Sequence, residues 1–261
     1  YPIPNVTISD SSGHSTITNE NGYYQLTGLS NGNNTISTRK DGFSFSPPSV
    51  TIPASSGSRE QNFEASLVSP NELTGVFYNT TEQIGSSLLY RLVLMPTKVA
   101  GFMNATNLPS NPKAYCGAGY FDGTRNNNAI SYQHLSLDLD PGCGFDHGAR
   151  FSVSGSIEPA GNHIWADYEA RNANGSNIVE GTGVFEAWTT GQKPQEVKYT
   201  GRFTNTGRVG DVTLDISIGE KTVFGFMNFS NSPGTSTLCG AGEFIGSKNG
   251  SNLEFVFHSN D

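Results

Sequence analysis

An internal repeat constrains this chain more than any other feature of its sequence. The block Gly101–Asn104 recurs as Gly225–Asn228, and the block Cys116–Gly123 recurs in closely similar form as Cys239–Gly246. The second copy reaches Asp261 before it has completed the unit that the first copy completes. We therefore expect one complete and one incomplete copy of a folding unit. Duplicating a scaffold extends a surface without creating catalytic geometry, so the repeat indicates an array-like protein.

Composition and length predict three all-β units. Only 15% of the 261 residues are charged, and Gly, Asn, Ser and Thr are abundant, which is typical of short strands and tight turns rather than helices. The repeat and a distinct N-terminal segment favour several smaller domains over a single large one. We expect a small β-sandwich at 1–66, a complete repeat at 71–190 and a partial repeat at 196–261, with a polar, proline-containing connector after the first unit.

The first unit has strand-like runs separated by turn signals. The pairs Asn21-Gly22 and Asp41-Gly42 supply the positive φ that tight turns need. The runs predict strands at 5–9, 15–18, 23–26, 34–38, 49–52 and 61–65.

The same segment resembles a known family of β-sandwiches. The runs Pro4–Ser9, Thr18–Leu29, Gly42–Pro47 and Asn62–Ala65 are similar to the carboxypeptidase-regulatory-like, transthyretin-like family. That family usually opens with one more strand, which carries a Gly-x-Val pattern and is missing here. The resemblance implies a transthyretin-like or Ig-like sandwich that acts as a spacer and carries no catalysis.

The complete repeat predicts an eight-stranded antiparallel barrel. Apolar and polar residues alternate in Phe151–Glu158, as a strand with one buried face requires. Consecutive strands joined by short turns most simply close into an up-and-down barrel, which removes exposed edges. We expect strands at 73–80, 87–96, 98–105, 115–124, 129–138, 150–158, 163–171 and 178–189. The expected interior residues are Leu92, Leu94, Val99, Met103, Phe121, Phe151, Val153, Ile157, Tyr168 and Phe185.

Three threonine- or glycine-rich segments resemble barrel repeats of secreted bacterial proteins. They are Thr74–Phe77, Val99–Met103 and Cys116–Gly123, and they look like parts of an avidin-like or lipocalin-like barrel. No ligand-binding residue of avidin can be matched position by position, so the resemblance implies a fold and no particular ligand.

The three cysteines suggest a disulfide. Cys116 and Cys239 occupy matching repeat positions. When the two copies are aligned, Cys143 of the first copy lies just beyond the position that matches Asp261 of the second. The economical interpretation is a Cys116–Cys143 disulfide, with the partner of Cys239 beyond Asp261, and it predicts an oxidising, extracellular or cell-surface location. The alternative is three buried free thiols, since cysteine is a common core residue.

One loop offers oxygen ligands to a metal ion. Asp138, Asp140 and Asp146 lie in a glycine-containing segment, and calcium prefers such hard oxygen ligands. The spacing fits no EF-hand, and the alternative is a loop that holds Asp and Gly for turn geometry alone. The five histidines have no spacing that favours a transition metal, so we expect surface or strand positions for them and no cofactor.

No pattern indicates an enzyme. No serine lies in a Gly-x-Ser-x-Gly elbow, and we assign no catalytic residue. The pairs Asp167/Glu169 and Glu180/Glu186 share strand faces, as the paired acids of a glycoside hydrolase would. The apolar sets lie at the opposite positions, so we expect these acids to face solvent, and a hydrolase is only a remote alternative.

Two tryptophans are candidates for contact with a glycan or ligand. Trp165 and Trp188 belong to the outward-facing sets of their strands, and aromatic faces suit sugar surfaces. The alternative is that they are simply exposed or partly covered surface residues.

Charge narrows the range of partners. The net charge of -8 is spread without a basic cluster, which disfavours nucleic acid and anionic membranes as partners, and no apolar run is long enough for a membrane-spanning helix.

The function predicted is a structural module of an extracellular, multi-domain surface or filament protein. Its partners would be neighbouring domains or copies of itself, joined by strand addition. The alternative function is a secreted binding module that uses the barrel interior or the tryptophan-bearing rim.

Overall fold

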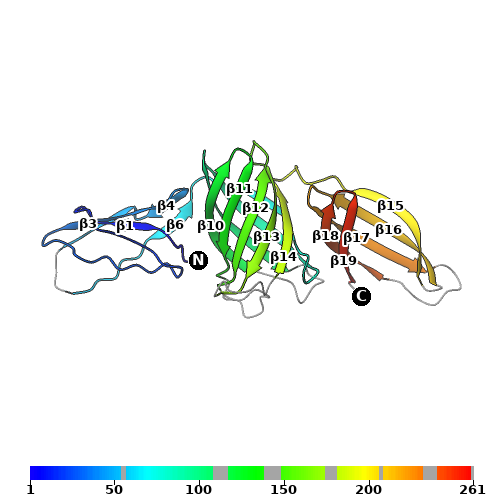
Figure 1. The fold of residues 1–261 in the computed structure, drawn as a ribbon, viewed down its shortest axis with the longest axis horizontal. Coiled ribbons are helices and arrows are strands. Elements are labelled where there is room, and N and C mark those ends of the chain that lie inside the picture. Colours follow the sequence, from blue (N-terminus) through cyan, green and yellow to red (C-terminus); the bar gives the residue numbers. More distant parts are fainter. Residues whose placement is uncertain are drawn as a thin grey trace.

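A computed structural model describes residues 1–53, 57–107, 117–137, 148–173, 181–205, 208–231 and 240–259. All of its regular structure is β, which confirms the predicted fold class. Two small N-terminal sheets, a closed barrel and a C-terminal sheet lie in a row along the long axis (Figure 1). Within these ranges there is no helix of the length and hydropathy that crossing a membrane requires.

The N-terminal sheets hold short strands. A four-stranded sheet has the order β2-β1-β3-β5, and a two-stranded sheet pairs β4 with β6. Their bounds are β1 (Thr7–Ser9), β2 (Ser15–Ile17), β3 (Asn34–Arg39), β4 (Phe43–Ser46), β5 (Ser49–Ile52) and β6 (Glu64–Leu67).

Two strand predictions in this region differ from the structure. Residues 23–26, expected as a strand, are in no strand, and β4 forms where none was expected. The apolar pattern of 23–26 has another cause. Tyr24 and Leu26 pack on the core by their side chains, and the Tyr24 hydroxyl donates a hydrogen bond to the Gln61 carbonyl at 2.8 Å. Side-chain burial therefore produced a strand-like pattern without a backbone ladder.

The barrel is a continuous antiparallel meander. Its strands are β7 (Asn71–Asn79), β8 (Ile84–Leu94), β9 (Lys98–Asn107), β10 (Gly117–Asn126), β11 (Ala129–Leu135), β12 (Arg150–Ile157), β13 (His163–Arg171) and β14 (Gly181–Trp188). Each strand pairs with its neighbours in sequence, and β14 pairs with β7 to close the ring. The eight-stranded closure expected from the sequence is confirmed.

Aromatic side chains fill the barrel interior. Nine of the ten residues predicted to point inward are buried, and Leu94 is half-buried against the same cluster. The rings of Phe121 and Tyr132 stack at 4.1 Å between centroids, and those of Phe77 and Tyr168 at 4.6 Å. His134 is buried on Phe151, and burial lowers its pKa to about 3, so it is neutral at physiological pH.

The C-terminal sheet repeats the first five strands of the barrel. It has the order β15 (Val197–Asn205), β16 (Arg208–Ile218), β17 (Thr222–Asn231), β18 (Gly240–Asn249) and β19 (Asn252–Ser259). The register is conserved: Gly101 pairs with Phe121 in the barrel, and Gly225 pairs with Phe244 here. Strands β15–β19 thus correspond one to one with β7–β11.

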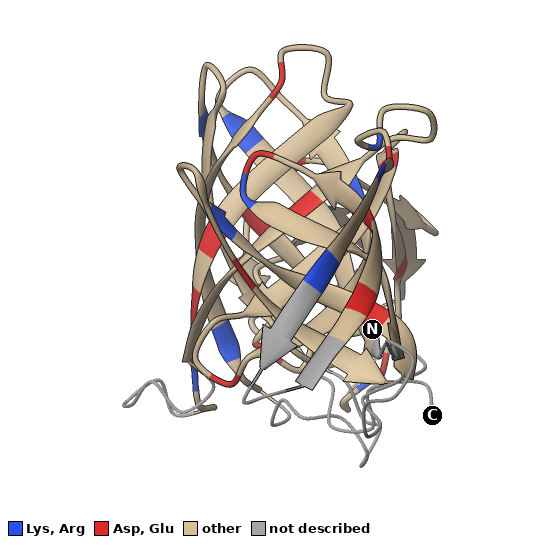
Figure 2. Ribbon diagram, turned by 90° about the vertical axis from the view of Figure 1, so that its right-hand side faces the viewer, with Lys and Arg blue, Asp and Glu red and all other residues tan. Residues whose placement is uncertain are grey.

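Charged residues are dispersed over the ribbon. Figure 2 shows Lys and Arg interspersed with Asp and Glu in the view along the long axis. This arrangement agrees with the even spread of charge in the sequence.

Candidate functional site

A buried cluster of hydrogen-bonded polar groups lies where the barrel meets the C-terminal sheet. We call this contact the C-terminal junction. On the barrel side, Trp188, Val76 and Tyr78 point outward from β14 and β7, and Phe224 and Ile245 of β17 and β18 cover them in one buried apolar cluster. Ile245 fits only because β8 has Gly85 beneath it, where an added Cβ would come within 2.0 Å of the Ile245 side chain.

A buried carboxylate holds the turn between β16 and β17. Glu186 of β14 is 0% exposed and receives backbone hydrogen bonds from Glu220 at 2.7 Å, Lys221 at 3.0 Å and Thr222 at 3.1 Å. The Thr222 hydroxyl donates to it as well, at 2.9 Å. The turn admits the carboxylate because Gly219 has no side chain: a Cβ there would lie 2.2 Å from Glu186 Oε2. Consecutive backbone N–H groups form a natural cradle for an anion.

His163 completes the cradle. Its Nε2 lies 2.7 Å from Glu186 Oε1, and its Nδ1 lies 3.1 Å from Glu158 Oε1. Burial opposes both charges, but the hydrogen bonds outweigh it: the pKa of His163 lies above 6.5 and the pKa of Glu186 lies below 4.5. Both shifts favour the charged pair.

The two candidate tryptophans meet at this junction. The His163 ring stacks on Trp188 at 5.4 Å and tilts against Trp165 at 4.7 Å. Trp188 is 3% exposed because Phe224 lies against it, while Trp165 is half-buried. Trp188 points outward from its strand as predicted, but a neighbouring unit covers that side of the strand.

The expectation that Glu186 faces solvent is wrong for the same reason, and His163 was not singled out at all. A signal was present in the outward positions of 181–188, which include Val184 and Trp188 beside Glu186. An apolar outer face on a barrel strand indicates that something covers it. Asp167, of the other pair expected in solvent, is exposed and binds Lys221 at 3.1 Å, and its companion Glu169 is half-buried beside Arg171.

A second junction joins the barrel to the N-terminal sheets. The core of those sheets includes Ala100 of β9, with Met95 and Tyr120 packed against it. Gly42 lies so near the barrel that its Cβ would come within 2.8 Å of Ala100 Cβ. Among the described residues, three ion pairs surround this N-terminal junction: Lys98–Asp41 at 2.5 Å, Lys40–Asp122 at 3.1 Å and Arg150–Glu20 at 2.5 Å.

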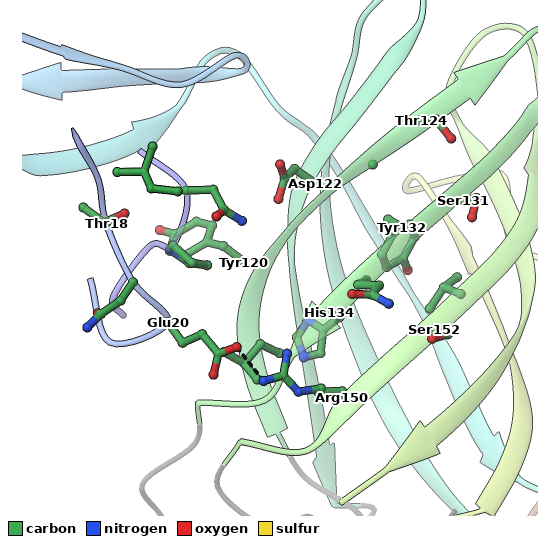
Figure 3. Close-up of a pocket in the computed structure, with 18 residues that line it drawn as sticks. Thr18, Glu20, Tyr120, Asp122, Thr124, Ser131, Tyr132, His134, Arg150 and Ser152 are labelled. Atoms are coloured by element: carbon green, nitrogen blue, oxygen red, sulfur yellow. Dashed lines mark hydrogen bonds and ion pairs between the residues drawn. The ribbon is translucent and has the colours of Figure 1, made fainter. Parts of the chain in front are cut away.

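A groove of about 770 Å³ runs along the N-terminal junction. Its walls carry hydroxyl, amide and carboxylate groups, including those of Thr124, Gln133 and Asp122, and the Tyr120 ring lines it. Figure 3 shows the Glu20–Arg150 ion pair bridging its lower end. A smaller pocket of about 370 Å³ lies at the C-terminal junction, beside His163 and Lys248.

Several predicted site residues lie outside the described ranges. They are Cys116 and Cys143 of the predicted disulfide, Cys239, the calcium candidates Asp138, Asp140 and Asp146, and Glu180. Within the described ranges, no group of three or more His, Cys, Asp or Glu residues is arranged to hold a metal ion.

Comparison with known proteins gives no relative: no family model, no curated protein and no solved structure matches this chain.

Proposed function

We propose that this chain is a structural module of an extracellular, multi-domain surface or filament protein, in which successive β units dock end to end. One observation carries the proposal: equivalent turns of the two repeats each dock on the preceding unit. The turn that begins at Met95 closes with a Met95 N to Lys98 O bond at 3.0 Å, and the matching turn closes with a Gly219 N to Thr222 O bond at 2.9 Å.

Both turns meet a carboxylate of the unit before them. Lys98 binds Asp41 of the N-terminal sheets, and the backbone of 220–222 binds Glu186 of the barrel. A docking element used twice at one position of a repeat is what a serial array needs, because each unit then joins the last in a similar way. The packed barrel interior adds support, because a solid core suits a scaffold.

The test is whether the N-terminal sheets, the barrel and the C-terminal sheet keep one fixed arrangement in solution. Small-angle X-ray scattering of the full chain should fit one extended arrangement, and Glu186→Ala should convert the profile to that of flexibly linked parts. Asp167→Ala is the matched control: it removes an exposed carboxylate at the same junction and should leave the profile unchanged. A wild-type profile that already requires flexible linkage would overturn the proposal.

A second candidate, glycan binding, is favoured by the groove at the N-terminal junction. Hydroxyl, amide and carboxylate groups beside the Tyr120 ring match the needs of a sugar surface. The two places expected from the sequence are less suitable, because rings fill the barrel interior and Trp188 is covered. Saturation-transfer NMR with neutral oligosaccharides tests this candidate. Transfer that is lost in Tyr120→Ala would support it, and absence of transfer from the wild-type chain would exclude it.

A further inference from the structure

The C-terminal sheet has the shape of a barrel wall with two open edges. In the barrel, β11 pairs onward with β12, and β7 pairs with β14. The corresponding strands β19 and β15 are the outermost strands of their five-stranded sheet and pair on one side only in the part of the chain that is described. Open edges present unpaired backbone N–H and C=O groups to any extended segment.

Large apolar side chains are exposed beside those edges, on the face that corresponds to the barrel interior. Leu73 of β7 is 0% exposed, whereas its counterpart Tyr199 of β15 is 53% exposed. Tyr132 of β11 is 4% exposed, whereas its counterpart Phe255 of β19 is 37% exposed. These positions therefore have the side chains of a barrel interior without the strands that cover it.

A glycine of β15 leaves room for a strand that the described residues do not supply. At Gly75 of β7, an added Cβ would lie 1.9 Å from the Glu186 carbonyl oxygen of β14, so the closing strand requires a glycine. Gly201 occupies the same register position in β15, yet an added Cβ would meet only Val212 Cγ1 at 3.8 Å. The glycines of β17 and β18 differ, since Gly225, Gly242 and Gly246 are all tightly approached by strands already present.

We propose that β15 and β19 bind a three-stranded antiparallel segment of the β12–β14 type, which completes an eight-stranded barrel. The occupant has apolar residues at alternate positions, and its last strand lies along β15 with a backbone carbonyl against Gly201. The barrel supplies the template, because its own β12–β14 perform this closure in the same register. The inference rests on the proposed function in one respect: the added strands would extend the row of units.

The test adds such a segment to the full chain. The probe is a peptide with the sequence of residues 148–190, added in trans to chain 1–261 and, in a second version, fused after Asp261 through a flexible linker. Binding should occur one to one and should slow amide exchange in 197–205 and 252–257 at least tenfold. In the fusion, the same amides should be protected intramolecularly and Tyr199 should become buried.

The Gly201→Ala variant distinguishes register-specific strand addition from nonspecific association of peptides with the sheet edge. The variant should leave the free chain unchanged, because the site is open, and should weaken peptide binding at least tenfold. Thr200→Ala, on the opposite face of β15, is the control and should bind as the wild type does. Equal binding by Gly201→Ala would overturn the proposal. So would a fusion whose edge amides exchange freely, or a free chain whose edges are already protected in a self-paired dimer. Solution scattering of Glu186→Ala reports on the C-terminal junction alone, so failure of either proposal can be told from failure of the other.

Discussion

The two junctions use the same turn of the repeat but different chemistry. At the N-terminal junction, Met95 extends from the turn to pack beside Gly42, and the charges around it are mostly exposed. At the C-terminal junction, Gly219 replaces that methionine, and the space admits the buried carboxylate of Glu186. The residue at this equivalent position thus differs along with the chemistry of the joint: Met95 lies in apolar packing with surface ion pairs, and Gly219 lies beside a buried anion cradle.

Placing a methionine at Gly219 should have the largest effect on the stability of a junction. Gly219→Met would drive a side chain into the carboxylate and leave three backbone N–H groups without an acceptor, which should destabilise the C-terminal junction by about 3 kcal/mol. Both tryptophans of the chain lie at this junction, so their fluorescence during denaturation measures it directly. Glu220→Met, one residue further along the turn and exposed, is the control. A Gly219→Met chain with wild-type stability would contradict the cradle.

The reciprocal change should cost less. Met95→Gly removes a half-buried side chain from the N-terminal junction, with an expected loss of about 1.5 kcal/mol. Faster amide exchange in β4 and β6 would report it, with no change in tryptophan fluorescence. Thr97→Ala, in the exposed part of the same turn, should leave exchange as it is. Unchanged exchange in Met95→Gly would show that packing does not hold this joint.

The junctions should also differ in their response to pH. The folded pKa of His163 is raised, so its contribution is complete below 6.5 and is lost as the pH rises through the raised value. The folded pKa of Glu186 is lowered, so its contribution is complete above 4.5 and is lost as the pH falls through the lowered value.

The C-terminal junction should therefore be most stable between about pH 4.5 and pH 6.5 and should lose stability on titration toward pH 9. Tryptophan fluorescence of the native chain follows this change. His163→Gln should remove the loss of junction stability at alkaline pH. A wild-type C-terminal junction that is equally stable at pH 6 and pH 9 would argue against the charged pair.

Salt should give the smallest difference. Lys98–Asp41 and Arg150–Glu20 are substantially exposed, and such pairs contribute about 0.5 kcal/mol each and are screened at about 1 M salt. Amide exchange at the N-terminal junction should rise slightly in salt, while tryptophan fluorescence at the C-terminal junction stays constant. Asp41→Ala should abolish the part due to Lys98. A larger salt effect at the C-terminal junction would reverse this ranking.

The barrel itself was largely readable from the sequence. Alternating apolar residues predicted its strand count, its closure and an interior set that includes Phe121 and Phe185, because side chains that point into a small barrel pack against one another. The repeat likewise predicted the correspondence between β7–β11 and β15–β19, since glycines such as Gly101 and Gly225 recur where a paired strand and a phenylalanine ring come close to the backbone.

Tertiary structure decided which outward-facing side chains are buried and what covers them, although the apolar outer positions of β14 indicated a cover. Parity placed Glu186 and Trp188 outside the barrel, but only the docking of the next unit determined that outside meant buried. The same holds for Ala100, which serves the core of the N-terminal sheets from the outer wall of the barrel. Local alternation records which side of a sheet a residue faces, whereas burial on that side depends on contacts between segments far apart in the chain, such as Glu186 and Thr222, which no local pattern encodes.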